Sequence, residues 1–277
     1  MKSSDTISEY STSSAISAAM EQRIQNELTR VEQAHGVKVL YACESGSRGW
    51  GFASQDSDYD VRFVYAHPAD WYLSVCPEKQ RDVLESGIVS TLDGVLDCSG
   101  WDVRKALRLL QKSNGALLEW LTSPIVYCKQ GSFADLALTT ATQGFSPLTL
   151  WHHYRSIRDK SLERFQTKQT AKVWLYAFRP MLAMLWIERG LGIPPTPFEI
   201  LVRELLSPQE QTETTVLVAH KRSGKENDHD FVPPPILAAF LDRQLARESE
   251  DCVDIPAARA MPNMDAVFRL LLRETFI

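Results

Sequence analysis

Two β-forming segments on either side of a glycine-rich turn constrain the fold of this chain more than any other feature. VKVLYACES at 37–45 and YDVRFVYA at 59–66 are rich in residues that favour strands. Between them stand Gly46, Ser47 and a segment that ends in Asp-Ser-Asp-Tyr-Asp. A strand, a turn, a short helix and a second strand would deliver the turn and the aspartates to one place.

Alternation along the second strand groups the acidic side chains. Successive strand residues point to opposite faces, so Asp58, Asp60 and Arg62 share one face. Asp56 has the same parity, but aspartate favours loops, and we interpret it as a turn residue. Two neighbouring carboxylates repel unless a positive charge lies between them, and Mg²⁺ prefers such oxygen ligands. The pair therefore predicts a divalent-metal site, where Arg62 either contacts a phosphate or offsets the acidic charge.

The Gly46-Ser47 turn predicts an anion site beside the aspartates. Glycine lets backbone N–H groups approach an anion closely, and the Ser47 hydroxyl adds a donor. RGWGF at 48–52 would then form a short helix whose N-terminus faces the same anion. Arg48 stands beside this turn, where a phosphate contact and a surface position are both open. An ordinary turn is the alternative, but the aspartates nearby favour function.

The rest of the chain predicts an α+β fold. GIVSTL, Asp93-Gly94 and VLDCS predict a β-hairpin, since Asp-Gly suits a type I′ turn. From Trp101 on, apolar residues recur almost wholly at helical spacing, with long helices expected at 146–165 and 171–190. We expect a small mixed sheet followed by a helical C-terminal half.

Composition limits the partners and the compartment. A formal net charge of -5 over 277 residues argues against a purely electrostatic grip on long nucleic acid. The five cysteines are scattered, which suits thiols in a reducing compartment. The N-terminal segment lacks a signal-peptide core, and the apolar stretch at 173–187 is short for a membrane span. We therefore expect a cytoplasmic protein that makes no membrane contact.

The ordered motifs resemble the polymerase-β-like nucleotidyltransferase superfamily, in which a Gly-Ser pair precedes Asp-x-Asp in a strand. The resemblance is closer to a bacterial and phage branch of predicted nucleotidyltransferases, some encoded beside RNA-repair genes. Besides the residues at 44–65, it includes HPADWYLS, the segment from LDCSGWDV to SPIVY, and YAFRPMLAMLWIERGLGIPP. These segments span most of residues 40–205.

This resemblance implies a two-metal transfer of a nucleoside monophosphate from an NTP to an acceptor hydroxyl, with release of pyrophosphate. Asp58 and Asp60 would hold two Mg²⁺ or Mn²⁺ ions, and Gly46 and Ser47 would grip the triphosphate. The acceptor stays open: an RNA end, tRNA, an aminoglycoside-like small molecule and a protein side chain all fit. The alternative is a non-catalytic nucleotide-binding or toxin-neutralising module of the same fold.

The superfamily also uses a third carboxylate on a later strand. Asp97 lies inside the strand candidate VLDCS, and we favour it as the third metal ligand. Asp102 is the second choice, because it begins a predicted helix, where a carboxylate satisfies free backbone N–H groups.

Three further features bear on nucleotide binding and on domain organisation. Arg179 lies among apolar residues, so it needs an acidic partner or an anionic ligand; we favour a structural pair and keep nucleotide binding as the alternative. The basic run Lys221, Arg222 and Lys225 is expected in a solvated loop, or against an acidic acceptor such as RNA. We divide the chain into a disordered tail (1–13), a catalytic domain (14–144) and a helical domain (145–277).

Overall fold

The computed structural model describes residues 16–76, 79–85, 95–223, 231–250, 255 and 260–276. The predicted tail at 1–13, the first predicted hairpin strand at 87–92 and the Asp93-Gly94 turn lie outside these residues. Lys225 and Cys252 lie outside them as well.

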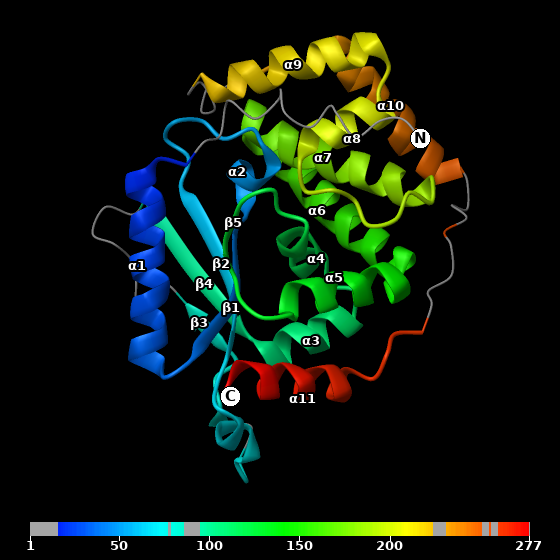
Figure 1. The fold of residues 1–277 in the computed structure, drawn as a ribbon. Coiled ribbons are helices and arrows are strands. Elements are labelled where there is room, and N and C mark those ends of the chain that lie inside the picture. The colour runs from blue at the N-terminus through cyan, green and yellow to red at the C-terminus, as the bar shows by residue number, and fades with distance from the viewer. Residues whose placement is uncertain are drawn as a thin grey trace, which may run out of the picture.

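A mixed five-stranded sheet forms the centre of the N-terminal half (Figure 1), with the strand order β3-β4-β2-β1-β5. The antiparallel pairs join β1 (Lys38–Glu44) to β2 (Tyr59–Ala66) and to β5 (Val126–Lys129), and β3 (Val83–Glu85) to β4 (Leu96–Asp102). Strands β2 and β4 are parallel. The mixed sheet and the α+β class are therefore confirmed.

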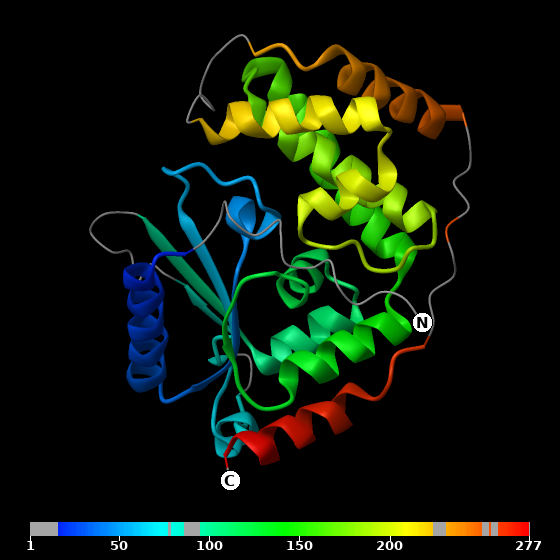
Figure 2. The ribbon, with the colours of Figure 1, turned by 45° about the horizontal axis from the view of Figure 1, so that its top comes forward.

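Helices cover both faces of this sheet (Figure 2). Helix α1 (Ala18–His35) packs on one face, and Gly36 ends it in the left-handed conformation. On the other face lie α3 (Val103–Gln111), α4 (Gly115–Leu121) and α5 (Phe133–Gly144). The last described helix, α11 (Met264–Thr275), returns to pack beside α3. Two short helices, α2 (Gly46–Trp50) and the 3₁₀ helix η1 (Ala69–Leu73), follow β1 and β2 respectively.

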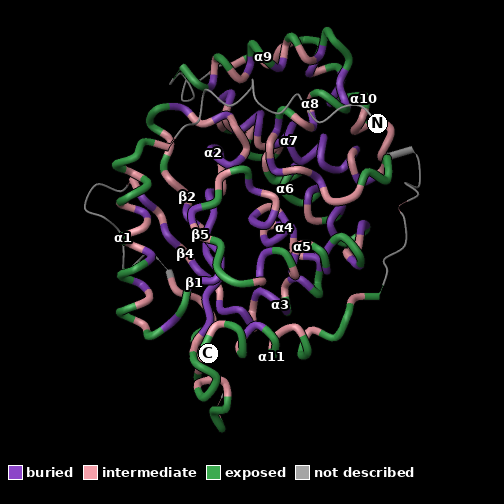
Figure 3. The backbone as a smooth tube through the Cα atoms, viewed as in Figure 1, coloured by how far each residue is buried: buried purple, intermediate pink, exposed green. Residues whose placement is uncertain are grey.

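The helical half is built around α7 (Ala171–Glu188), almost all of which is buried (Figure 3). Around it lie α6 (Pro147–Thr167), α8 (Phe198–Leu205), α9 (Pro208–Arg222) and α10 (Pro235–Glu250). Phe52, which follows α2, belongs to the same apolar core as α7, so the two halves share core side chains. The division at residues 144 and 145 stays a prediction.

Asn114 is the N-cap of α4: its side chain accepts a hydrogen bond from the Leu117 backbone N–H at 3.0 Å. One local expectation was wrong: the loop expected from residue 221 starts later, because α9 continues through Arg222.

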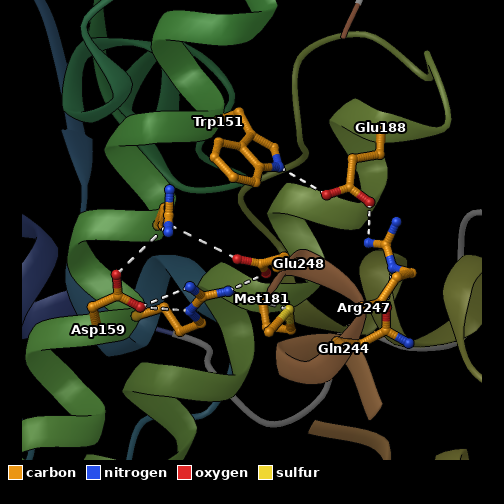
Figure 4. Close-up of polar contacts among 9 residues, drawn as sticks. Trp151, Asp159, Met181, Glu188, Gln244, Arg247 and Glu248 are labelled. Carbon is orange, nitrogen blue, oxygen red and sulfur yellow. Dashed lines mark hydrogen bonds and ion pairs between the residues drawn. The ribbon is translucent and has the colours of Figure 1, made fainter. Parts of the chain in front are cut away.

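Two ion pairs attach α10 to the long helices α6 and α7 (Figure 4). Arg158 of α6 is 2% exposed and pairs with Glu248 of α10 and with its neighbour Asp159. Arg247 of α10 pairs with Glu188, which also accepts a hydrogen bond from the Trp151 indole at 2.8 Å.

We expect Glu248→Gln to lower the free energy of unfolding by about 3 kcal/mol, the lower end of the range for breaking a buried pair, because Arg158 keeps Asp159. Asp242→Asn is the matched control, since Asp242 is exposed on the same helix and should change stability by less than about 0.5 kcal/mol. Urea unfolding measures both variants. Equal stability of the two would contradict the role assigned to this ion pair.

Candidate active site

Sheet topology brings three separate segments to one edge. Strand β1 runs antiparallel to β2, and β4 runs parallel to β2. The C-terminal end of β1 therefore lies beside the N-terminal ends of β2 and β4. The Ser45 backbone N–H donates to the Asp60 carbonyl at 2.8 Å and closes this edge. Helix α2 then begins at Gly46, two residues before the short helix predicted at 48–52.

The Gly46 turn and the Asp60 carboxylate are in direct contact. Gly46 has a φ of 58°, in the left-handed region. A Cβ atom at this position would lie 2.2 Å from Asp60 Oδ2. Ser47, the next residue, is also buried. Glycine is thus required here both by backbone conformation and by the approach of the carboxylate.

Asp60 and Asp97 are neighbours across the parallel strand pair. They are aligned in register, and Arg62 Nη2 bridges them at 3.0 Å from Asp60 Oδ1 and 2.8 Å from Asp97 Oδ2. Of the two roles considered for Arg62, this structure shows the offset of acidic charge. Asp58 immediately precedes β2 and is exposed, and Asp56 lies in the turn expected for it.

The charges of Asp58 and Asp97 both act on the Asp60 carboxylate. Burial raises the pKa of Asp60; Arg62 opposes this rise, and the charges of Asp97 and Asp58 add to it. Lys172, near the start of α7, also lowers the pKa of Asp60. The site edge therefore combines repelling carboxylates with cations from β2 and from the helical half.

The oxygen ligands at this edge suit Mg²⁺ or Mn²⁺ chemically, since hard divalent cations prefer carboxylates. Among the described residues, no three or more His, Cys, Asp and Glu side chains are gathered together as a complete set of metal ligands. Asp60 and Asp97 are instead neutralised by Arg62. Metal ligation by Asp58, Asp60 and Asp97 stays a prediction.

Asp102, the second choice for the third carboxylate, lies far from this edge. It stands five positions after Asp97 on β4, about 16 Å further along the strand. Its side chain accepts hydrogen bonds from the Arg104 backbone N–H at 2.8 Å and from the Tyr72 hydroxyl at 2.7 Å. Asp102 is thus the N-cap of α3, the structural role that its sequence position allowed.

Arg48 and Arg179, both candidates for nucleotide binding, are buried and already engaged. Arg179 pairs with Glu119 at 2.8 Å and lies 4.4 Å from the centre of the Trp50 ring, which confirms the expected acidic partner. Glu119 also accepts a hydrogen bond from the Trp50 indole at 3.2 Å. This pair fixes the end of α2 against α4 and α7. Nucleotide binding by Arg179 stays a prediction.

Sequence reasoning missed Glu44, the last residue of β1. It is fully buried, accepting hydrogen bonds from the Asp60 backbone N–H at 2.9 Å and from the Tyr127 hydroxyl at 2.5 Å. Burial raises the pKa of Glu44 to about 7, against the effect of these hydrogen bonds. A glutamate that ends an otherwise apolar strand was the available signal. The Glu44 carboxylate therefore fixes the backbone of Asp60 through the Asp60 N–H.

Comparisons with known proteins show the family of this chain. The model of the RNA repair pathway DNA polymerase beta family (RlaP) matches residues 20–270, so the chain belongs to this family. The chain is 41% identical over 243 residues to "Uncharacterized protein YcgL" of Bacillus subtilis (strain 168), covering 87% of this chain and 91% of that protein. Membership of this family indicates nucleotidyl transfer.

One solved structure is more distant. A nucleotidyltransferase-like protein from Exiguobacterium sibiricum 255-15 covers 74% of this chain and 75% of its own, at 14% identity and a TM-score of 0.31. That likeness is too weak to inform the site. In the part of the chain that the structure describes, no helix has the length and apolar character to cross a membrane.

Proposed function

We propose that this protein transfers a nucleoside monophosphate from an NTP to an acceptor hydroxyl and releases pyrophosphate. One observation carries the proposal: the Gly46-Ser47 turn touches Asp60, which is aligned with Asp97 on the neighbouring strand. The expected phosphate turn and the expected metal ligands thus share one edge of the sheet. Membership of a polymerase beta family supports the same reaction.

Different residues would bind the triphosphate and the metal ions in this reaction. Gly46 and Ser47 would bind the triphosphate through backbone N–H groups and the serine hydroxyl. Asp58, Asp60 and Asp97 would hold Mg²⁺ or Mn²⁺, which neutralises phosphate charge and favours ionisation of the acceptor hydroxyl. The acceptor oxygen then forms a bond to the α-phosphorus. The bond from that phosphorus to the bridging oxygen breaks, and pyrophosphate leaves with its electron pair.

An RNA end or tRNA is the acceptor class that we propose. The description of the family as an RNA repair pathway family supports this choice. The cysteines in the described residues, Cys43, Cys76, Cys98 and Cys128, have free thiols, which fits the cytoplasmic location that we propose.

Incubation with each α-labelled NTP, Mg²⁺ or Mn²⁺ and a pool of RNA tests this function. We expect the label to join RNA and pyrophosphate to accumulate in equal amount. Protein alone is the parallel reaction, because self-labelling would identify a protein acceptor. Mg²⁺-dependent stabilisation by NTP without any label transfer would instead support a non-catalytic nucleotide-binding module.

A further inference from the structure

The basic residues expected in a solvated loop include one that is fully buried. Lys221, near the end of α9, has 0% exposure. Its ammonium group donates hydrogen bonds to the hydroxyls of Ser54 at 3.2 Å and Ser57 at 3.1 Å. Burying an ammonium group costs free energy unless polar groups accept its hydrogen bonds, so the two serine hydroxyls are needed to keep Lys221 at this position. Figure 2 shows the end of α9 over the loop that links α2 to β2.

The two serines that receive Lys221 close this loop on itself. The Ser54 backbone N–H donates to the Ser57 hydroxyl at 3.0 Å, and the Ser57 N–H donates to the Ser54 carbonyl at 3.2 Å. The two hydroxyl oxygens lie 2.9 Å apart. Asp58 is the next residue of the chain. The ammonium group of Lys221 is therefore bonded to the turn that leads directly into Asp58.

Arg48 holds the same segment from the side of α2. Its guanidinium donates to the Ser57 carbonyl at 2.5 Å and to the Asp58 carbonyl at 3.2 Å, and stacks 3.9 Å from the centre of the Tyr59 ring. Arg222 of α9 donates to the Gly51 carbonyl at the start of the loop. Cations of α2 and α9 thus bind the loop from Gly51 to Asp58, and Arg48 also stacks on Tyr59, the residue after Asp58.

We propose that Lys221 is a positioning residue for the metal site, acting through the Ser54–Ser57 turn to keep Asp58 beside Asp60. Because the Asp58 side chain is exposed, its place depends on the main chain that Lys221 and Arg48 fix. Metal binding at the sheet edge is thereby linked to the position of α9. This inference rests on the proposed function, since it takes Asp58 as a metal ligand.

Binding of Mn²⁺, measured by electron paramagnetic resonance with α,β-methylene-ATP present, tests the inference without turnover. We expect Lys221→Met to weaken Mn²⁺ binding about tenfold, as for other residues that orient metal ligands. Arg203→Met is the matched control: it removes the same charge from an exposed site on α8 and should leave Mn²⁺ binding unchanged.

A double-mutant cycle separates positioning from a general effect. Asp58→Ala should weaken Mn²⁺ binding by at least as much as Lys221→Met, and adding Lys221→Met to Asp58→Ala should weaken it no further. The inference is overturned if the two losses multiply, or if Lys221→Met binds Mn²⁺ as tightly as the unmodified protein.

Failure of the proposed function and failure of this inference give different results, and a second variant covers loss of folding. Should the unmodified protein bind no Mn²⁺, the proposed metal site is rejected, and the inference with it; failure of the cycle alone rejects only the role of Lys221. Should Lys221→Met lose cooperative thermal unfolding, Ser57→Ala replaces it, because this variant removes a hydroxyl that receives Lys221. The same tenfold loss and the same lack of additivity are then required.

Discussion

A protein that carries both Asp58→Ala and Asp60→Ala should lose nucleotidyl transfer, by at least about a thousandfold, and should remain folded. Metal ligands at a phosphoryl-transfer site stabilise the transition state by several kcal/mol, and each 1.4 kcal/mol corresponds to about a tenfold change in rate. The fold should tolerate the change. Asp60 is destabilised as a carboxylate by burial and by its acidic neighbours, and Arg62 keeps its bond to Asp97 at 2.8 Å.

Asp56→Ala is the matched control for this double variant. Asp56 is exposed in the turn of the same loop, with the same charge, and should retain near-normal transfer. Label transfer to RNA and thermal unfolding measure the two properties separately. Retained transfer in the folded double variant would remove Asp58 and Asp60 from the reaction.

Local chemistry made much of the site edge predictable. Strand propensity located β1 and β2, and a short helix was predicted between them at 48–52, where α2 spans Gly46–Trp50. Side-chain parity correctly placed Asp60 and Arg62 on one face, as their 3.0 Å ion pair shows. Asp58 only partly fits that reasoning, because β2 begins one residue after it.

Long-range pairing could not be predicted in this way. The register that aligns Asp60 with Asp97, rather than with Asp102, depends on contacts between strands distant in sequence. The partner of Arg179 was expected to be acidic, but nothing local singled out Glu119, 60 positions earlier.

Helix α9 was missed for a local reason. Its threonines and valines have weak helix propensity, and they obscured the capping box of Ser207 and Glu210 that marks its start. Without that helix, Lys221 could only be assigned to a loop, and its burial over the Asp58 turn could not be foreseen.

Gly46→Ala should lower nucleotidyl transfer by about a hundredfold while costing only about 1–2 kcal/mol of stability. The added methyl group would lie 2.2 Å from Asp60 Oδ2 and 3.1 Å from its carboxyl carbon. A carboxylate can rotate away from such a contact at little cost to the fold. That rotation moves Asp60 relative to Asp97 and to the triphosphate, and misplacement of about 1 Å is enough for a loss of this size.

Gly36→Ala isolates the contribution of this contact. Gly36 has nearly the same backbone conformation, φ 61° against 58° for Gly46, but a Cβ atom there would meet nothing within 4 Å. Both variants should therefore show a similar loss of stability in thermal unfolding, since both force alanine into the left-handed region. Only Gly46→Ala should lose transfer activity. If the two variants were equally active, the contact between the turn and Asp60 would have no part in the reaction, and backbone conformation alone would account for the glycine at position 46.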